Sequence, residues 1–238
     1  EVVIRDWSSD VCSSDLVERS GENFRIILRI VYTGFMRNRN LPLNRIERPG
    51  FPAAAAAVLV LALLNMGFSW TNNVVLKSPL FLDSIFTALG ASVLGPWAGM
   101  GIGLLTNLGM EPIYGMTGFY WPFAACNMAT GLIVGLMSRK GAFNQGWHAT
   151  AAVVLVTLAN ALLGGFIANL VFSGDTGVQI DNIVSAFTET GLSLFTANFW
   201  ARIPTNLIDK MLAVYAAFWV RAWARSRVSG TDMEGGTA

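Results

Sequence analysis

The chain has 238 residues, of which 53% are hydrophobic and 13% charged, with a formal net charge of +1. Average soluble domains have about 25% charged residues, so this composition excludes an ordinary water-soluble fold. We expect an integral membrane protein whose surroundings are the lipid bilayer and which has no nucleic-acid partner.

The first residues differ from everything that follows them. Asp6 to Asp15 can be back-translated into ten codons that resemble a common short-read sequencing adaptor, in one open frame. The alternative is a native polar tail, since Ser and Asp favour turns. We interpret residues 1–16 as a non-native, adaptor-derived segment and exclude them from the fold. Cys126 then remains alone, as a small packed residue rather than a redox group.

Residues 17–50 form a basic segment that precedes the apolar sequence. Arg25 and Arg29 lie four residues apart among Ile, Leu, Val and Phe, a pattern that fits an amphipathic helix on the membrane surface. An equally good interpretation is a frayed leader beside missing sequence.

The apolar sequence that follows predicts a bundle of about six transmembrane helices over residues 51–224. The apolar runs are continuous and lack the alternation of barrel strands, so the fold class is all-α. A Gly-Pro pair at 95–96 predicts a sharp turn between the second and third spans. The spans are expected near 52–70, 79–95, 97–109, 117–137, 148–172 and 204–220.

Basic residues predict the orientation of these spans. They occur before the first span, at Arg139 and Lys140 after the fourth, and after the last. By the positive-inside rule all three groups, and therefore both termini, are cytoplasmic. This requires an even number of crossings, so residues 182–200 should lie at the outer surface or re-enter. Residues 225–238 are predicted to be a disordered tail.

Small residues recur at four-residue spacing, as in Gly99/Gly103, Gly131/Gly135 and Ala53/Ala57. Such faces let membrane helices approach closely. Most are expected to be internal packing, and at least one could be a docking face for another subunit.

No catalytic set is visible, and we expect neither an enzyme nor a cofactor. The single His148 lies at a span boundary, and no P-loop or metal-ligand cluster occurs. Polar and aromatic residues instead gather at the outer ends of several spans. These candidate substrate-binding residues are Asp83, Asn107, Glu111, Tyr114, Tyr120, Trp121, Arg202, Asn206 and Asp209.

Two interpretations of these residues stay open. Charged groups inside a membrane are costly and commonly line a cavity or pair with one another. In the first interpretation they form a ligand pocket with aromatic walls. Alternatively, they are an interfacial aromatic belt with structural ion pairs such as Asp83 with Arg202 or Lys210.

The stretch "PLFLDSIFTALGASVLGPWAGMGIGLLTNL" at 79–108 resembles the substrate-capture S components of energy-coupling factor (ECF) transporters. The resemblance covers about residues 50–224 and includes Ala53/Ala57 and the Gly95, Pro96, Gly99, Gly103 hairpin. It implies about six helices in the cytoplasmic membrane and capture of a vitamin or similar micronutrient outside the cell.

The resemblance also implies partners, namely a transmembrane coupling subunit and two ATPase subunits, with Ala53 and Ala57 as the docking face. No single vitamin's motif is matched. The alternative is a membrane sensor that binds a ligand without transporting it. A small secondary transporter would need paired broken helices or inverted repeats, which the sequence does not show.

Overall fold

The computed structural model describes residues 51–139, 143, 145–177 and 180–234, with side chains as far as Trp223. Within them all regular structure is helical, as the fold class predicted. The helices are α2 (Phe51–Thr71), η2 (Asn72–Leu76), α3 (Ile85–Leu94), α4 (Pro96–Ile113), α5 (Ala124–Arg139), α6 (Gly146–Phe172), α7 (Ile180–Glu189) and α8 (Leu194–Glu234). The adaptor-like and basic segments before Phe51 lie outside the described residues.

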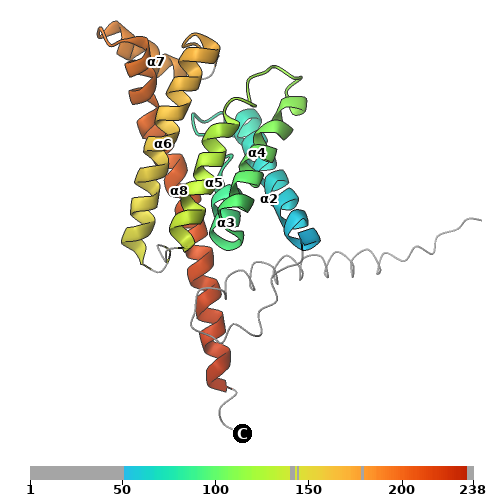
Figure 1. Cartoon of the computed structure of the whole chain (residues 1–238). Helices are drawn as coiled ribbons and strands as arrows, with labels where there is room; N and C mark the ends of the chain where they lie inside the picture. Colours follow the sequence, from blue (N-terminus) through green and yellow to red (C-terminus); the bar gives the residue numbers. More distant parts are fainter. Residues whose placement is uncertain (1–50, 140–142, 144, 178–179, 235–238) are drawn as a thin grey trace, which may run out of the picture.

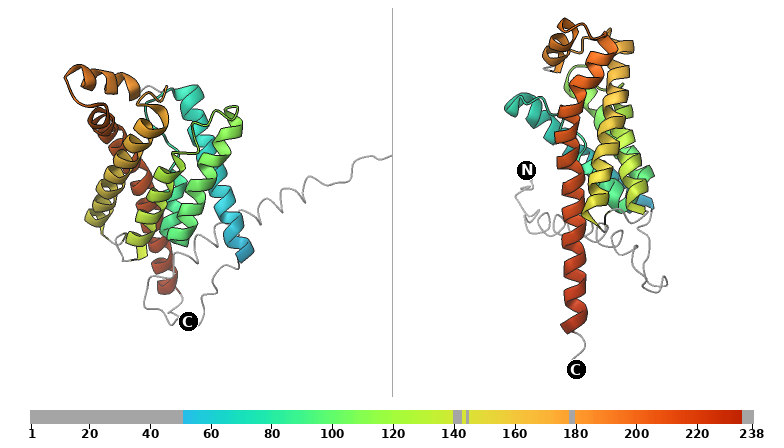
Figure 2. Two further views of the ribbon diagram at one scale, coloured as in Figure 1. Left: turned by 45° about the horizontal axis from the view of Figure 1, so that its top comes forward. Right: turned by 90° about the vertical axis from the view of Figure 1, so that its left-hand side faces the viewer.

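The helices form one bundle in which α6 and α8 pair along one side, α3 and α5 lie centrally, and α2 and α4 lie on the other side (Figure 1). Figure 2 shows α8 projecting beyond the other helices at one end and α7 lying across the opposite end. The continuous helix Phe51–Leu76 and α6 are both long and apolar enough to cross a membrane. The six-span count itself stays a prediction.

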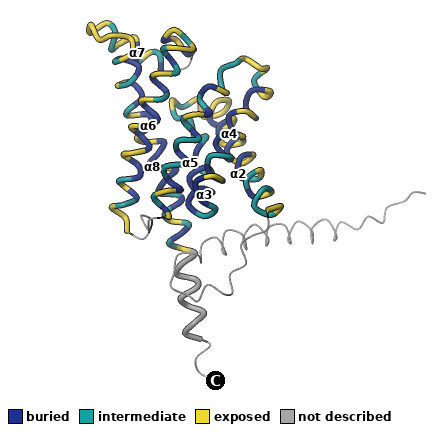
Figure 3. The backbone as a smooth tube through the Cα atoms, viewed as in Figure 1, coloured by how far each residue is buried: buried dark blue, intermediate teal, exposed yellow. Residues whose placement is uncertain are grey.

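Burial in this bundle places polar groups inside and large apolar side chains outside (Figure 3). Leu63 of α2 and Leu162 of α6 are 62% and 52% exposed. Asn65 is fully buried, and its Nδ2 donates to Thr87 Oγ1 at 2.8 Å and Thr106 Oγ1 at 3.3 Å. A lipid-facing outer surface and an internally hydrogen-bonded core are what a membrane-spanning bundle needs.

The small-residue spacing is confirmed as internal packing where α4 meets α5. A Cβ atom added to Gly131 would lie 2.3 Å from the carbonyl carbon of Gly99, and one added to Gly135 would lie 2.4 Å from Pro96 Cα. Side chains at these positions would force the backbones apart. The glycines therefore set the distance between the two helices.

The second predicted span is not a continuous helix. Residues 77–84 are non-helical, and α3 begins only at Ile85. Pro79 has no backbone N–H and disfavours a helical Ser78, while Lys77 and Leu82 have positive φ angles. With ten residues α3 is about 15 Å long, half of a typical hydrocarbon core. We call residues 77–84 the unwound segment.

Two further boundaries differ from the prediction. The fourth span was expected from 117, but α5 begins at Ala124, because Gly115, Met116 and Gly118 have positive φ angles and cannot continue a helix. The expected disordered tail is partly helical, since α8 continues to Glu234, although its last residues include Ser, Gly, Thr and Asp, which have low helix propensity. Residues 235–238 lie outside the described residues.

Residues 182–200 were expected to lie at the outer surface of the membrane or to re-enter it. They divide between α7, a four-residue connection at 190–193 and the first residues of α8. Ile180 and Val184 of α7 pack against Ala197 and Ala201 of α8. Helix α7 therefore covers the end of the bundle as an amphipathic element.

Candidate ligand-binding site

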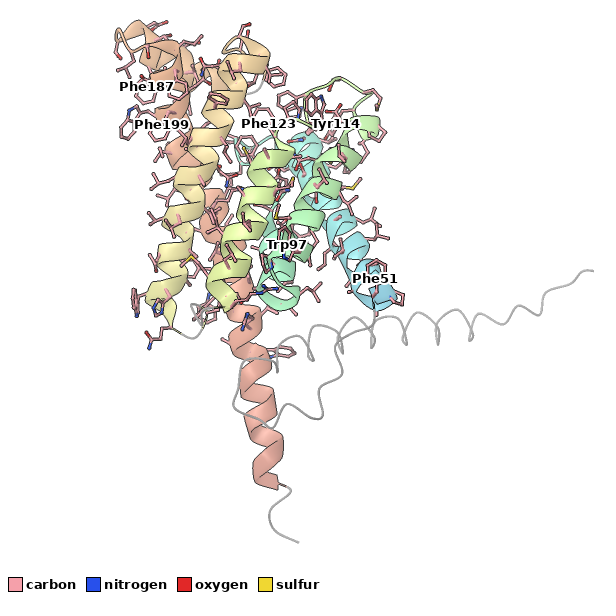
Figure 4. All side chains as sticks on the ribbon, in the orientation of Figure 1. Phe51, Trp97, Tyr114, Phe123, Phe187 and Phe199 are labelled. Atoms are coloured by element: carbon pink, nitrogen blue, oxygen red, sulfur yellow. The ribbon has the colours of Figure 1, made fainter. Side chains whose placement is uncertain are left out.

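A cavity of about 400 Å³ lies between the helices, at the end of the bundle where Figure 4 labels Tyr114 and Phe123. Its walls come from the end of α2, η2, the unwound segment, α4, the loop before α5, α5, α6 and α8. The polar and aromatic lining residues are Ser69, Asn73, Lys77, Ser78, Phe81, Asp83, Thr106, Asn107, Phe119, Tyr120, Phe123, Cys126, Asn127, Asn160, Arg202, Asn206 and Lys210.

The unwound segment forms one wall, and side chains of other helices satisfy its backbone. The amide N–H of Leu82 donates to Asp209 Oδ1 at 2.9 Å, and the carbonyl of Asp83 accepts from Asn127 Nδ2 at 2.9 Å. The carbonyl of Leu80 accepts from Asn72 Nδ2. Irregular backbone at membrane depth is tolerated where it lines a cavity or is buried in protein, which is its situation here.

An ionic cluster joins the unwound segment to α8. Lys210 Nζ lies 2.6 Å from Asp209 Oδ2, 2.8 Å from Ser84 Oγ and 3.9 Å from Asp83 Oδ1. Asp209 is fully buried and Lys210 is 3% exposed. The predicted structural pairing of Asp83 with Lys210 is present, and the described ion pairs do not include one between Asp83 and Arg202.

Arg202 is the second buried cation at this cavity and is 2% exposed. Its Nη1 donates to the carbonyl and to the side-chain oxygen of Asn198, one turn earlier on α8. Its side chain lies beside Gly164 of α6, where an added Cβ would be 3.3 Å from Arg202 Cδ. The absence of a side chain at Gly164 therefore makes room for the arginine.

Four asparagines from four helices also line the cavity. Asn127 Nδ2 donates to Asn107 Oδ1 at 3.1 Å, and Asn107 Nδ2 donates to the carbonyl of Tyr120 at 3.1 Å. Asn160 donates to Thr130 Oγ1 at 3.0 Å, and Asn206 donates to the carbonyl of Arg202 at 2.8 Å. These bonds hold the amide groups in fixed orientations.

Aromatic rings from the loop before α5 cover part of the cavity. Tyr120 stacks on Tyr114 with ring centroids 4.9 Å apart, and Phe119 contacts Phe123 at 5.4 Å. Asn73 Nδ2 donates to the Tyr120 hydroxyl across the cavity mouth at 3.3 Å. Burial, reinforced by Tyr114, raises the pKa of Tyr120, so this phenol stays neutral at physiological pH.

Glu111 holds this loop rather than lining the cavity. Its carboxylate accepts hydrogen bonds from the backbone N–H groups of Gly118 at 3.0 Å, Tyr120 at 2.5 Å and Trp121 at 2.8 Å. Glu111 is 5% exposed, whereas Trp121 is 55% exposed and absent from the lining. Tyr114 reaches the site only through its ring contact with Tyr120.

The candidate residues therefore fall into two groups. Those that line the cavity are Asp83, Asn107, Tyr120, Arg202 and Asn206, and those that do not are Glu111, Tyr114, Trp121 and Asp209. Asp209 instead supports the cavity wall, because it accepts a hydrogen bond from the Leu82 N–H in the unwound segment and pairs with Lys210.

Several lining residues were not among the sequence candidates. Asn127, Asn160 and Lys210 are the principal polar ones, and Phe119, Phe123 and Cys126 add apolar surface. An available signal was the isolated amide in each of α5 and α6, because an unpaired amide within an apolar helix is costly to bury. Among the described residues, no three His, Cys, Asp or Glu side chains cluster as a metal site requires.

The two alanines expected to dock a partner differ in exposure. Ala53 is partly exposed near the start of α2, whereas Ala57 is 5% exposed and belongs to the interior. They lie toward the end of the bundle opposite the cavity, where Figure 4 labels Phe51 and Trp97.

Comparison with known proteins gives one family match. A family model described as "ECF transporter, substrate-specific component" matches residues 50–220, which include every described helix up to most of α8. No curated protein and no solved structure matches the chain.

Proposed function

The chain belongs to the substrate-specific components of ECF transporters, and from this premise we propose that its cavity captures a vitamin or similar micronutrient. Membership makes it a membrane-embedded, non-enzymatic substrate-binding subunit that associates with other ECF transporter components. The finer proposal is capture at the outer side of the cytoplasmic membrane, with both termini cytoplasmic. Delivery follows through a coupling subunit driven by two ATPases.

The observation that supports this proposal best is the unwound segment. It breaks a membrane span at the point where the cavity lies, and its backbone is satisfied by Asp209, Asn127 and Asn72. Breaking a span costs backbone hydrogen bonds, and proteins accept this cost at substrate sites. A cavity of about 400 Å³ with aromatic and amide walls has the size and lining of a small-molecule site.

The proposed orientation is supported by the distribution of basic residues. Arg139 and Arg221 lie at the end of the bundle that contains the α3–α4 turn, since Arg139 is beside Gly95 and Arg221 donates to the Ser92 carbonyl. This end is cytoplasmic by the positive-inside rule. The cavity then opens on the outer side.

Filling the cavity tests the capture function. Cys126 lines the cavity, while Leu162 lies on the outer face of α6. The full chain, purified in detergent from cells grown in rich medium, is heat-treated, and the released small molecules are measured by mass spectrometry. We expect wild type and Leu162→Trp to release one molecule in near-stoichiometric amount and Cys126→Trp to release none.

Equal release from both variants, with all three proteins folded by size-exclusion chromatography, would contradict capture in this cavity. Co-expression with a coupling subunit and two ATPases distinguishes transport from sensing. A transporter subunit co-purifies with them, and a stand-alone sensor does not.

A further inference from the structure

Arg202 has an unused hydrogen-bonding edge. Nη1 is occupied by Asn198, but within the described residues Nε and Nη2 donate no hydrogen bond to protein. The side chain is 2% exposed and lines the cavity. The Nε–Nη2 edge of a guanidinium is the geometry that holds a carboxylate or phosphate through two parallel hydrogen bonds.

The nearby carboxylates are engaged elsewhere. Asp209 and Asp83 share Lys210. Asp181 attracts Arg202 electrostatically without forming a described ion pair with it, and its carboxylate accepts from the Thr176 N–H and hydroxyl, both at 2.9 Å. No ion pair joins Arg202 to an acidic residue in the part of the chain that the structure describes. A buried cation without a close counter-ion is expensive, so the missing anion is expected to come from the bound molecule.

Asn127 supplies an independent observation from α5. Both hydrogens of its Nδ2 are used, on the Asp83 carbonyl and on Asn107 Oδ1, and this fixes the orientation of the amide. The remaining Oδ1 is buried and has no hydrogen-bond partner, while the residue is 1% exposed and lines the same cavity. An orphaned buried acceptor calls for a donor on the occupant.

We propose that the captured molecule is a small organic anion with an N–H donor. Its carboxylate or phosphate binds the Nε–Nη2 edge of Arg202, and its N–H group donates to Asn127 Oδ1. This inference rests on the proposed function and adds the charge and polarity of the substrate. Lys210 already contacts Asp209, Asp83 and Ser84 and holds the unwound segment. Arg202 is therefore the cation that binds the anion.

The test uses a defined set of probes on the detergent-purified full chain. Small carboxylic acids are each paired with their neutral methyl ester, and phosphate monoesters with their parent alcohols. Every pair is present with and without an N–H group. Native mass spectrometry and melting curves measure binding. We expect acids or phosphates with an N–H group to bind roughly ten- to hundredfold more tightly than their neutral partners.

Arg202→Gln should abolish this preference, and Arg139→Gln, which removes an exposed arginine at the other end of the bundle, should keep it. If Arg202→Gln does not fold, the comparison of charged and neutral probes on the wild-type protein still tests the proposal. Gly164→Ala is a milder variant, since its Cβ would approach Arg202 Nε to 3.4 Å. We expect it to weaken acid binding and leave neutral probes unaffected.

Equal or tighter binding of the neutral probes would overturn the proposal, as would an acid preference that survives Arg202→Gln. Binding of no probe would also count against it. None of these results contradicts the proposed capture function. That function is tested separately, by the molecule released from cell-grown protein and by the Cys126→Trp variant.

Discussion

Lys210 shows how a single buried residue supports the site. It contacts Asp209, Ser84 and Asp83, and it joins α8 to the unwound segment at 3% exposure. Its positive charge neutralises the fully buried carboxylate of Asp209 and lies near the partly exposed one of Asp83. Loss of this residue would leave acidic groups uncompensated in the interior.

We predict that Lys210→Met lowers the melting temperature in detergent by roughly 6–20 °C, from about 3–5 kcal/mol for a broken buried ion pair. Glu189→Gln, which removes an exposed charge on α7, is the matched control and should melt as wild type. The double variant Asp209→Asn/Lys210→Met should recover part of the loss. An unchanged melting temperature for Lys210→Met would contradict the ionic role.

Glu111 is expected to act on the loop that covers the cavity. In Glu111→Gln the amide cannot accept all of the hydrogen bonds from Gly118, Tyr120 and Trp121 that the carboxylate accepts. We predict faster hydrogen–deuterium exchange in the peptide covering residues 114–123 and unchanged exchange in α6. The retained molecule should dissociate faster. Uniform exchange across both peptides would show that Glu111 does not hold the loop.

At the residue scale the sequence pointed to the end of the bundle where the cavity lies and to part of the cavity's lining. Arg202, Asn206, Asn107, Asp83 and Tyr120 were identified because ionisable, amide and aromatic groups are unusual at membrane depth. Whether such a side chain faces the cavity or the protein backbone depends on helix rotation and loop path. Composition and spacing do not determine either, and Glu111 and Trp121 illustrate this.

At the element scale, the contact between α4 and α5 depends on glycine. We predict that Gly131→Ala destabilises the protein by about 1–3 kcal/mol, because the new methyl group would meet the Gly99 backbone. Gly67→Ala is the control, since an added Cβ on that residue of α2 meets nothing within 4 Å. Melting curves in detergent measure both variants. Equal melting temperatures would show that the helices can separate without cost.

The start of α2 provides the prediction about partner docking. We expect Ala53→Trp, on a partly exposed face, to prevent co-purification with the coupling subunit while the small molecule is still retained. Ala57→Trp should instead lower the melting temperature, because Ala57 is 5% exposed. If Ala53→Trp co-purifies normally, the docking face must lie on another helix.

Hydropathy predicted the long helices well and the broken ones poorly. The span at 148–172 matches α6 closely, since a continuous apolar run has one stable structure in lipid. The run at 79–95 is also largely apolar, but Pro79 and hydrogen bonds with Asn72, Asn127 and Asp209 favour an unwound start. Asn127 and Asp209 lie far from this run in the sequence, so a local pattern could not identify them as partners.

At the scale of the whole molecule, we predict that residues 1–16 contribute nothing to folding. Deletion of these residues should leave the expression level and the melting temperature in detergent unchanged, because Asp6 to Asp15 fit ten consecutive codons that resemble a sequencing adaptor. A large loss of folded protein would refute the adaptor interpretation. Release of the retained small molecule from the shortened chain provides a second readout.

The hydrogen bond from Leu82 to Asp209 joins residues 127 positions apart, and this separation matters during synthesis. A ribosome adds the unwound segment long before α8, so the Leu82 amide initially has no acceptor and Lys210 is not yet present. Until the last helix inserts, the backbone of the nascent segment must be hydrated by water or bound by a chaperone. Assembly of the binding site is thus a late step of biogenesis, and chains halted before residue 209 would expose this segment to membrane proteases.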